Sequence, residues 1–386
     1  MKKILLISQC IPQWYADLLS SALINIGELE IVTGSNIKGN IICKTPVYKS
    51  DKILSKLISW FKYFIYVNNW MKKNKKINYD LVICVSNPPI NSYIGLKLKN
   101  VFNSKFIYMN WDLYPQIISS TFKSRFLKLI CNIWEKWNIT YFPKIDKILT
   151  IGNVMGESIC KNNREMINVD IIPVSVNVNK LKPIDKKENI FVKNNKLENK
   201  FIVLYSGKMG IGHNIEIILE SANILSSNEQ IEFVFIGGGA KYNMIENYIY
   251  KNKSSNILLL PWQTENTFPL SIACGDIGIV SQEVNISHLF MPSKTYSMMA
   301  CGEAIIGICT EYDDLCRTIK KCKCGETVTD GNPITLANII LRLSYDKNTL
   351  NKYKEASRMS AETFYSDEVI KEKYIKLFNE ILCINK

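Results

Sequence analysis

The sequence lacks the motifs on which several enzyme classes depend. It holds only two histidines in 386 residues, and it contains no His-Glu-x-x-His motif, no Gly-x-Ser-x-Gly motif and no aspartate-rich metal loop. Zinc peptidases, hydrolases with a nucleophile elbow and calcium-binding loops are therefore unsupported. Cys316, Cys322 and Cys324 lack Cys-x-x-Cys spacing and a nearby histidine, so we expect no metal site.

Long apolar runs are also missing. The most apolar stretch, residues 53–71, is interrupted by Lys56 and Lys62, whereas a spanning helix needs about 18 uninterrupted apolar residues. The basic-then-apolar start, Met1 to Ile7, is too short for a signal sequence and is typical of a buried strand. The twelve cysteines are scattered, which indicates reduced thiols. We expect a cytoplasmic protein that does not cross a membrane.

Acidic residues are scarce in the first half only. Residues 1–180 hold 24 Lys and Arg against 11 Asp and Glu, whereas residues 181–386 hold 24 of each, so the net charge of +13 arises in the first half. This asymmetry indicates an anionic partner, either lipid headgroups with a lipid diphosphate or a nucleic acid, unless it reflects compositional drift. Nucleic-acid binding rests on charge alone, so we expect no such partner.

Two segments of the first half combine apolar and basic residues at helical spacing. Residues 53–71 carry Ile53, Leu57, Trp60, Phe61, Phe64 and Met71 near one face, with Lys52, Lys56 and Lys62 around it. Residues 122–137 carry Phe122, Phe126 and Trp134 among Lys123, Arg125 and Lys128. Either stripe alone is equally compatible with a core-facing helix. Together with the charge asymmetry, they favour peripheral contact with the anionic inner face of a membrane.

Apolar, β-branched runs alternate with longer amphipathic segments, which indicates β-α units on parallel sheets. The expected strands are residues 3–8, 29–33, 81–86, 105–109, 147–151 and 169–173, then 201–205, 232–236, 256–260, 277–280 and 304–308. A Lys/Asn-rich stretch separates the two series. We predict an α/β fold of two Rossmann-like, doubly wound domains facing each other across a cleft, with strand ends at the facing edges. The predicted boundaries are 1–183, a linker at 184–200, 201–366, and a final helix at 367–386 that crosses back to the first domain.

Glycine-spaced turns after two strands of the second domain indicate phosphate binding. Gly207, Lys208, Gly210 and His213 lie between strand 201–205 and a helix expected at 215–225. Glycines let the backbone approach a diphosphate, and Lys208 and His213 would add cationic donors. Gly237, Gly238 and Gly239 form a second such turn. Similar turns also occur without any ligand, and this spacing is not a dinucleotide fingerprint.

A third candidate anion site is the segment Met291-Pro292-Ser293-Lys294-Thr295. Pro292 and Ser293 have the chemistry of a helix start, and the helix would offer free N–H groups beside Lys294. An ordinary helix cap is the alternative. The chain's two histidines, His213 and His288, are both expected near the cleft.

The order of these segments resembles the donor half of family 4 GT-B glycosyltransferases. The matching segments are Ser206-Gly207-Lys208, Gly237-Gly238-Gly239, Leu259-Leu260-Pro261-Trp262, Ala273 to Ile277, Pro292-Ser293-Lys294 and Ala300-Cys301-Gly302. In the first half, Ser86-Asn87-Pro88-Pro89, Asp112-Leu113-Tyr114-Pro115-Gln116 and Ile172-Pro173 resemble segments of the bacterial capsule, O-antigen and colanic-acid transferases, the WbuB-like group. The resemblance covers nearly the whole chain.

The resemblance implies a nucleotide-sugar donor, with a UDP-sugar favoured, as co-substrate and no cofactor. Lys208 and His213 stand where two basic residues grip the donor diphosphate, and His213 replaces a lysine. Ser293, Lys294 and Thr295 would present amides to the phosphates, Trp262 would lie near the nucleobase and Gly238 near the sugar or diphosphate. The paired glutamates of typical members fall on Leu289 and Ser297, so recognition of the ribose and the sugar must differ.

The resemblance also implies a retaining, metal-independent transfer to a lipid-linked or growing saccharide in surface polysaccharide synthesis. Asp112 is a candidate catalytic residue, with Asn87 as the alternative for positioning the acceptor hydroxyl, and Asn87, Pro88 and Tyr114 are expected to bind the acceptor. Two other functions remain open. One is a nucleotide-sugar 2-epimerase, which needs acidic acid/base residues. The other is a non-catalytic nucleotide-sugar or polysaccharide-binding subunit.

Overall fold

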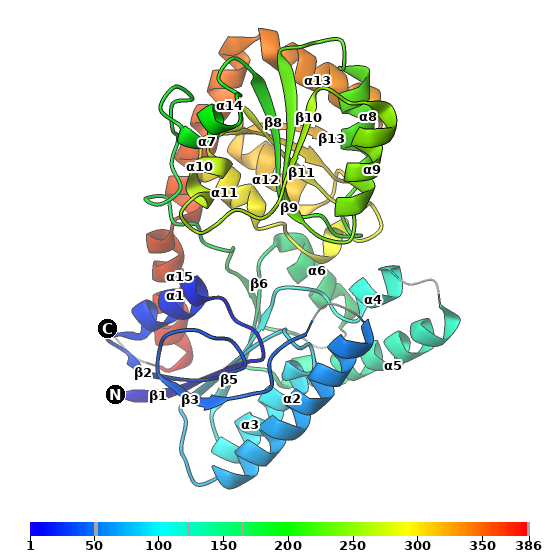
Figure 1. The fold of residues 1–386 in the computed structure, drawn as a ribbon. Coiled ribbons are helices and arrows are strands. Elements are labelled where there is room, and N and C mark those ends of the chain that lie inside the picture. The colour runs from blue at the N-terminus through cyan, green and yellow to red at the C-terminus, as the bar shows by residue number, and fades with distance from the viewer. Residues whose placement is uncertain (50–52, 122–123, 164–165, 384–386) are drawn as a thin grey trace. The chain divides into compact units, whose positions relative to one another are not determined.

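The computed structural model describes residues 1–49, 53–121, 124–163 and 166–383, drawn as a ribbon in Figure 1. Contacts divide the chain into two compact units. The first unit holds residues 1–173 and 368–386, and the second holds residues 174–367. The last helix therefore belongs to the first unit although it follows the second in the chain.

The first unit is a seven-stranded parallel sheet in the order β3-β2-β1-β4-β5-β6-β7. Side chains of β1, β4, β5 and β6 that point to one face pack with α1 and α15. On the other face, Gly95 of α3 lies directly against the ring of Phe106 in β5, and the buried Tyr63 belongs to α2. The elements of this unit are β1 (Lys2–Ser8), α1 (Gln13–Leu23), β2 (Gly27–Thr33), β3 (Ile41–Lys44), α2 (Ile53–Lys73), β4 (Leu81–Val85), α3 (Asn91–Phe102), β5 (Lys105–Asn110), α4 (Gln116–Thr121), α5 (Arg125–Tyr141), β6 (Lys147–Thr150), α6 (Asn153–Asn162), β7 (Val169–Ile171) and α15 (Asp367–Ile381).

The second unit is a six-stranded parallel sheet in the order β10-β9-β8-β11-β12-β13. One face of its central strands packs against α8, α9 and α13, and the small Gly278 and Gly307 on the other face lie against α11 and α12. The elements are α7 (Ile190–Asn194), β8 (Phe201–Lys208), α8 (Glu216–Ile224), β9 (Ile231–Gly238), α9 (Tyr242–Asn252), β10 (Ile257–Leu260), α10 (Phe268–Ile272), β11 (Ile277–Ser281), α11 (Lys294–Ala300), β12 (Ala304–Ile308), α12 (Asp314–Cys322), β13 (Gly325–Val328), α13 (Pro333–Tyr345) and α14 (Lys347–Ser360).

Two doubly wound parallel sheets confirm the predicted α/β class, and every predicted strand is present. The reason is visible in the burial of the strands: β4, β11 and β12 are buried at every residue. Strands covered by helices on both faces must be apolar throughout, so they appear in the sequence as continuous β-branched runs. Two further strands, β3 and β13, lie at the sheet edges and were not predicted.

The segment 184–200, predicted as a linker, instead packs as part of the second unit. The buried Asn189 caps α7 through the Phe191 amide at 2.9 Å and donates to the Leu270 carbonyl, also at 2.9 Å. Phe191 and Val192 are buried. A Lys/Asn-rich composition therefore does not make this segment a flexible connection, because Phe191, Val192 and Leu197 are buried, although Ile190 is exposed.

The two amphipathic helices expose more apolar surface than a core-facing helix would. On α5 the exposed side chains are Phe126, Leu129, Ile130, Ile133 and Trp137, and on α2 they are Leu57, Ile58, Phe61, Ile65 and Tyr66. The predicted face of α2 is corrected, because Met71 is buried and Trp60 and Phe64 are half-buried. Lys52, Phe122 and Lys123 and the side chain of Ile53 lie outside the described residues. Within the described part of the chain, no helix has the length and apolar content that crossing a bilayer demands.

Candidate functional site

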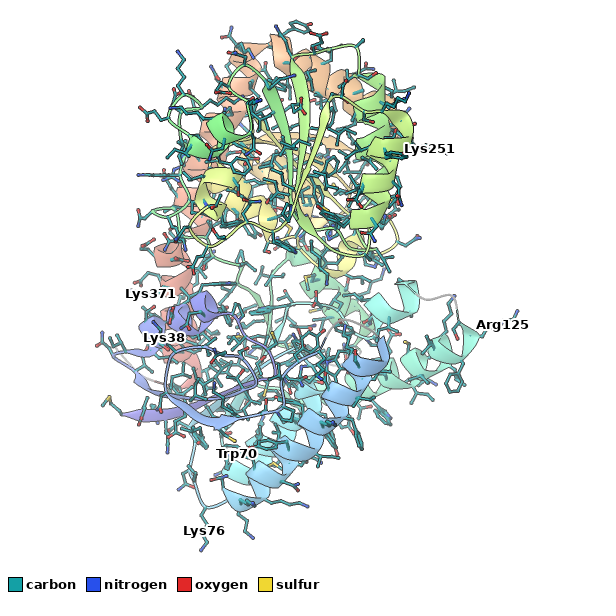
Figure 2. All side chains as sticks on the ribbon, in the orientation of Figure 1. Lys38, Trp70, Lys76, Arg125, Lys251 and Lys371 are labelled. Atoms are coloured by element: carbon teal, nitrogen blue, oxygen red, sulfur yellow. The ribbon has the colours of Figure 1, made fainter. Side chains whose placement is uncertain are left out.

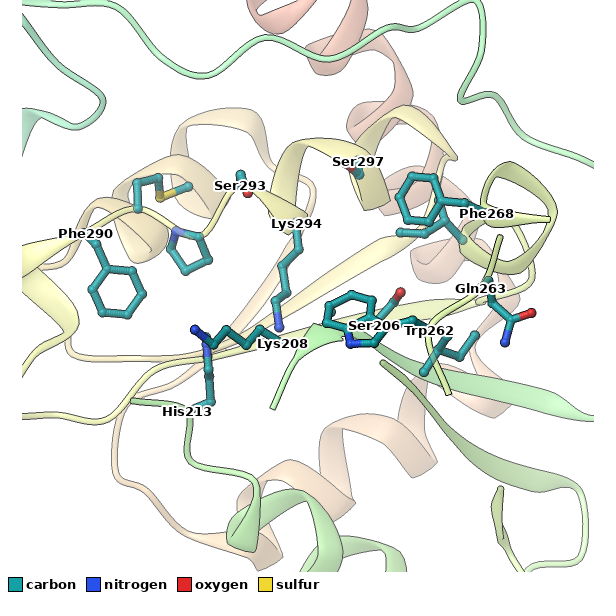
Figure 3. Close-up of a pocket in the computed structure, with 15 residues that line it drawn as sticks. Ser206, Lys208, His213, Trp262, Gln263, Phe268, Phe290, Ser293, Lys294 and Ser297 are labelled. Carbon is teal, nitrogen blue, oxygen red and sulfur yellow. The ribbon is translucent and has the colours of Figure 1, made fainter. Parts of the chain in front are cut away.

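The main candidate site lies at the topological switch point of the second sheet. From β8 the chain winds outward through β9 to β10, then returns to β11 on the other side of β8. In open α/β sheets, the loops that follow the two central strands leave a crevice there that binds ligands. A cavity of about 410 Å³ opens beside these loops, and it is lined entirely by residues of the second unit. Figure 3 shows its lining side chains.

Two glycine-rich turns interlock below this cavity. The Met209 amide donates to the Gly238 carbonyl at 2.9 Å, and the Lys241 amide donates to the Met209 carbonyl, also at 2.9 Å. Gly239 has φ +145°, and a Cβ there would lie 2.5 Å from the Met209 oxygen. Only glycine accepts both this backbone conformation and this close approach. The second glycine turn therefore holds the first one in place.

Lys294 brings a buried positive charge to the cavity. Its Nζ lies 3.8 Å from the centre of the Tyr205 ring and has no hydrogen-bond partner among the described residues. Burial lowers the pKa of this ammonium from 10.5 to about 7. A Cβ on Gly207 would lie 3.1 Å from Lys294 Cε, so glycine at 207 leaves room for the lysine. A buried ammonium without a partner is costly, and an anionic ligand would offset that cost.

Lys208 and His213 line the same cavity, as predicted, but the two side chains differ in charge. Lys208 is exposed at the end of β8. The pKa of His213 is lowered to about 4, first by burial and then by the positive charge of Lys294. The prediction that His213 adds a cationic donor is therefore wrong for the protein without ligand, because the ring is neutral near pH 7.

The rest of the lining is mostly apolar. The exposed ring of Trp262 contributes to it together with Ile236, Phe268 and Ile272, whereas Phe290 lies beside His213. Gly238 lies under Trp262, because a Cβ on this glycine would come 2.8 Å from the indole Nε1. A cavity lined by both cations and aromatic rings suits a ligand with one anionic and one planar apolar part. Among the described residues, no Asp or Glu lines it.

Most of the residues predicted to bind the donor do line the cavity, namely Gly207, Lys208, His213, Trp262, Pro292, Ser293 and Lys294. Gly210, Gly238, Gly239 and Thr295 do not. The Thr295 amide already donates to the Pro292 carbonyl at 3.2 Å, so it is not free for a phosphate. His288, expected near the cleft, is exposed on the surface and outside the cavity.

Five other lining residues were missed by sequence reasoning, namely Ile236, Gln263, Phe268, Ile272 and Phe290. Three more, Ser206, Met291 and Ser297, stood within the segments singled out in the sequence but were not predicted to bind the donor. Ser297, the position of one paired glutamate in typical members, lies one turn after Lys294 in α11. Phe268 and Ile272 belong to the short α10, whose five residues give no clear periodic signal. Leu289 is buried and does not line the cavity.

The residues predicted to bind the acceptor lie in the first unit, where Asn87 and Pro88 follow β4 at a switch point and Tyr114 follows the neighbouring β5. There the sheet order changes between β1 and β4, and the Gln9 amide after β1 donates to the Asn87 carbonyl after β4 at 3.0 Å. Pro88 is buried, and Asn87, Asp112 and Tyr114 are half-buried. Burial raises the pKa of Tyr114, and the negative charge of Asp112 raises it further.

Aromatic rings surround Tyr114. Its ring stacks on Trp134 of α5 at 6.3 Å and lies edge-on to Trp60 of α2 at 6.2 Å. Lys56 Nζ lies 4.9 Å from the Trp60 ring. Aromatic faces and cations are common in saccharide and diphosphate recognition, which is the role predicted for this cluster.

Comparisons with known proteins agree with this architecture. Residues 186–360 match the family model described as glycosyl transferases group 1. The chain is 20% identical over 347 residues to the probable glycosyltransferase WbjE of Pseudomonas aeruginosa, which covers 89% of this chain and 85% of that protein. It is 30% identical over 124 residues to the putative colanic acid biosynthesis glycosyl transferase WcaI of Escherichia coli K12, covering 31% of this chain and 30% of that protein.

Solved structures share the fold at low sequence identity. The sucrose-phosphate synthase of Thermosynechococcus elongatus has a TM-score of 0.79 at 16% identity, with all of both chains covered. Anabaena HepE in complex with UDP-glucose has a TM-score of 0.74 at 12% identity, covering 98% of this chain and 100% of that one. The chain therefore has the predicted GT-B fold. It is a glycosyltransferase, and residues 186–360 form its group 1 glycosyl transferase domain.

Proposed function

We propose that this glycosyltransferase is a retaining, metal-independent enzyme of bacterial surface polysaccharide synthesis, such as capsule or O-antigen assembly. It moves a sugar from a nucleotide diphosphate, with a UDP-sugar favoured, to a lipid-linked or growing saccharide. The observation that carries the proposal is the buried, unpartnered ammonium of Lys294 in a cavity shared with Lys208. A diphosphate would provide the missing negative charge.

The donor assignment has two supports. The structural relative HepE is described in complex with UDP-glucose, and WcaI is named for colanic acid biosynthesis. The ammonium groups of Lys208 and Lys294 would stabilise the departing nucleoside diphosphate, which is the task that a divalent ion performs in other transferases. Trp262 or Phe268 would pack on the nucleobase. The absence of carboxylates from the described lining weighs against a 2-epimerase, which needs acid/base residues there.

The acceptor assignment rests on the first unit. Asp112, with Asn87 as the alternative, would position the acceptor hydroxyl, and Tyr114 and Pro88 would contact the acceptor saccharide. The excess of positive charge in residues 1–180 and the exposed apolar side chains of α2 and α5 support peripheral contact with the anionic inner face of the cytoplasmic membrane.

A first experiment tests the donor. The full chain is heated with a panel of UDP- and GDP-sugars, with and without EDTA. A bound donor raises the melting temperature by mass action. We expect a UDP-sugar to give the largest shift, and we expect EDTA to leave it unchanged. No shift with any nucleotide sugar would reject the donor assignment.

A second experiment tests transfer. Release of nucleoside diphosphate is measured with the best donor, with or without a lipid-linked saccharide acceptor. A transferase releases the nucleotide only when the acceptor is present, and the anomeric configuration of the product reports retention. An epimerase would change the sugar without acceptor-dependent release, and a binding subunit would do neither.

A further inference from the structure

The ring of His213 is held in one orientation at the edge of the cavity. It lies edge-on to Tyr205 at 6.3 Å and edge-on to Phe290 at 6.2 Å. Its Nδ1 lies 2.7 Å from the carbonyl oxygen of Ser281, at the end of β11. The ring therefore joins the loops that follow the two central strands, β8 and β11, with little freedom to rotate.

The bond to Ser281 determines which ring nitrogen carries the hydrogen. A carbonyl oxygen can only accept a hydrogen bond, so Nδ1 must be the N–H donor. In the neutral ring, Nε2 then carries a lone pair and can only accept. Burial and the nearby charges of Lys294, Lys241 and Lys208 all oppose a second proton.

The charges around His213 are unequally available to a ligand. Lys241 Nζ is paired with Glu216 at 2.7 Å and Glu283 at 3.3 Å, and it donates to the His213 carbonyl. Lys208 and Lys294 line the cavity itself. A Cβ on Gly210 would lie 3.6 Å from His213 Cδ2 and 4.0 Å from Lys208 Cε. The ring edge that carries Cδ2 and the accepting Nε2 therefore lies near the Lys208 side chain.

We propose that His213 binds a hydroxyl of the nucleotide sugar as a neutral hydrogen-bond acceptor, while Lys208 and Lys294 hold the diphosphate. This role rests on the proposed donor binding. A sugar diphosphate is fully ionised at neutral pH, so its phosphate oxygens have no hydrogen to give, and they would repel the Nε2 lone pair. The hydroxyls of the ribose and of the transferred sugar do carry hydrogen. His213 therefore contributes selectivity for hydroxyls instead of charge for phosphate.

Spectroscopy of the intact chain tests this directly. Because the chain has only two histidines, ring ¹⁵N labelling gives two ring systems, and the exposed His288 is assigned with His288→Gln. Near neutral pH, we expect His213 to show a protonated Nδ1 and an unprotonated Nε2, both free and with saturating UDP-glucose. A ring that becomes doubly protonated when UDP-glucose binds would overturn the proposal in favour of a phosphate contact.

Binding measurements identify the source of the hydroxyl. Affinities of wild type, His213→Leu and His213→Gln are compared for UDP-glucose, UDP and 2′-deoxy-UDP. If the sugar supplies the hydroxyl, His213→Leu lowers the preference for UDP-glucose over UDP by about threefold to tenfold, the usual effect of one hydrogen bond. If the ribose supplies it, the preference for UDP over 2′-deoxy-UDP falls instead. His213→Gln, whose amide oxygen can accept, restores part of the preference.

Two results separate the failure of this role from failure of the proposed function. Equal loss of affinity for all three ligands in His213→Leu, with recovery in His213→Lys, would show a cationic phosphate grip and overturn the acceptor role alone. Absence of UDP and UDP-glucose binding in the wild type would reject the donor assignment, and the role of His213 with it.

Discussion

Lys294 illustrates a side chain whose position costs stability. Its residue lines the cavity, but its ammonium is buried against the Tyr205 ring and has no hydrogen-bond partner among the described residues. The folded pKa of about 7 lies well below the usual value, so the folded state binds fewer protons than the unfolded state above pH 7. The full cost is present below about pH 7 and declines as pH rises toward the pKa of the unfolded chain, about 10.4.

The first prediction concerns Lys294→Met. At or below about pH 7, we expect the ligand-free variant to melt a few degrees above wild type, because a buried charge is replaced by an apolar chain of similar length. It should bind UDP-sugar at least about tenfold more weakly. Thermal melts with and without UDP-sugar check both effects.

The matched control is Lys251→Met, which removes an exposed lysine of α9 that points away from the unit in Figure 2. Equal effects in both variants would contradict the assignment.

The second prediction follows from the same pKa. Below about pH 7, Lys294 is already charged, so UDP-glucose affinity should vary little. Above it, a proton must be taken up on binding, and Kd should rise by up to about tenfold per pH unit. Calorimetry in buffers of different ionisation enthalpy measures this uptake. Lys294→Met should remove the pH dependence, and a wild-type affinity that stays constant from about pH 7 to about pH 9 would contradict it.

At the residue scale, the sequence predicted the cations and the glycines better than the walls of the site. Gly207, Lys208 and Lys294 were found because turns after parallel strands must use glycine where ligands or side chains come close. Gln263 and Phe268 were missed because their proximity arises from chain segments that meet only in the folded sheet. The charge of His213 was predicted wrongly, since residue type alone does not reveal burial or neighbouring lysines.

At the scale of elements, the signal in the sequence depends on how each strand is covered. The central β4 and β11 are buried on both faces and were predicted from their apolar runs. The edge strands were missed: β3 has only four residues of alternating exposure, and β13 begins with Gly325 and is largely half-exposed. Edge strands need not be apolar, so they leave a weak pattern in the sequence.

The third prediction concerns α5, whose exposed apolar side chains lie among Arg125, Lys128 and Lys136. Figure 2 shows Arg125 extending into solvent. Replacing Leu129 and Ile133 by Gln should lower binding to anionic vesicles by about tenfold or more. In the wild type, each of these side chains would bury apolar surface in the membrane, and Gln would not. The melting temperature should change little, since both side chains are exposed. The control is the pair Ile224→Gln and Tyr250→Gln, two exposed positions of the second unit. Unchanged vesicle binding in the α5 variant would contradict the prediction.

The fourth prediction concerns Glu303, immediately before β12. It is fully buried, neither carboxyl oxygen has a hydrogen-bond partner among the described residues, and burial raises its pKa well above 4.5. The unfolded chain therefore loses this proton at a lower pH than the folded chain, and stability falls as pH rises above about 4.3. Glu303→Gln keeps the shape without the ionisable proton. We expect its melting temperature to exceed that of wild type by a few degrees near pH 7 and by less near pH 4. A difference that does not vary with pH would contradict this reading.

At the scale of the whole molecule, the sequence predicted two doubly wound sheets and a final helix that returns to the first of them, but not where the second unit begins. The second unit begins near residue 174 and not after residue 200, because Phe191 and Val192 dock on it. The final helix joins the first unit through Ile370, Tyr374, Leu377 and Phe378, which pack into the core beside α1. The start of the second unit depends on tertiary packing, which a change in composition along the chain does not reveal.

The fifth prediction concerns the whole chain and its uneven charge. Residues 1–180 carry 24 basic and 11 acidic residues, whereas the remainder is balanced, so a negatively charged bilayer attracts the first half far more strongly. Each basic residue near such a surface contributes about 1 kcal/mol, and the interaction decays over about 10 Å at 0.1 M salt and about 3 Å at 1 M. Binding to vesicles with anionic lipid should therefore fall steeply with salt. Neutral vesicles should bind weakly at every salt concentration.

The apolar side chains of α5 give this prediction a second part. Apolar burial is not screened by salt, so a fraction of the binding to anionic vesicles should persist at about 1 M salt, and it should be this fraction that the Leu129 and Ile133 replacements remove. Vesicle co-sedimentation across a salt series separates the two contributions. If vesicle binding disappears completely at high salt, the contact depends on charge alone. If vesicle binding is the same at every salt concentration and for anionic and neutral lipids, the role of the basic first half is rejected.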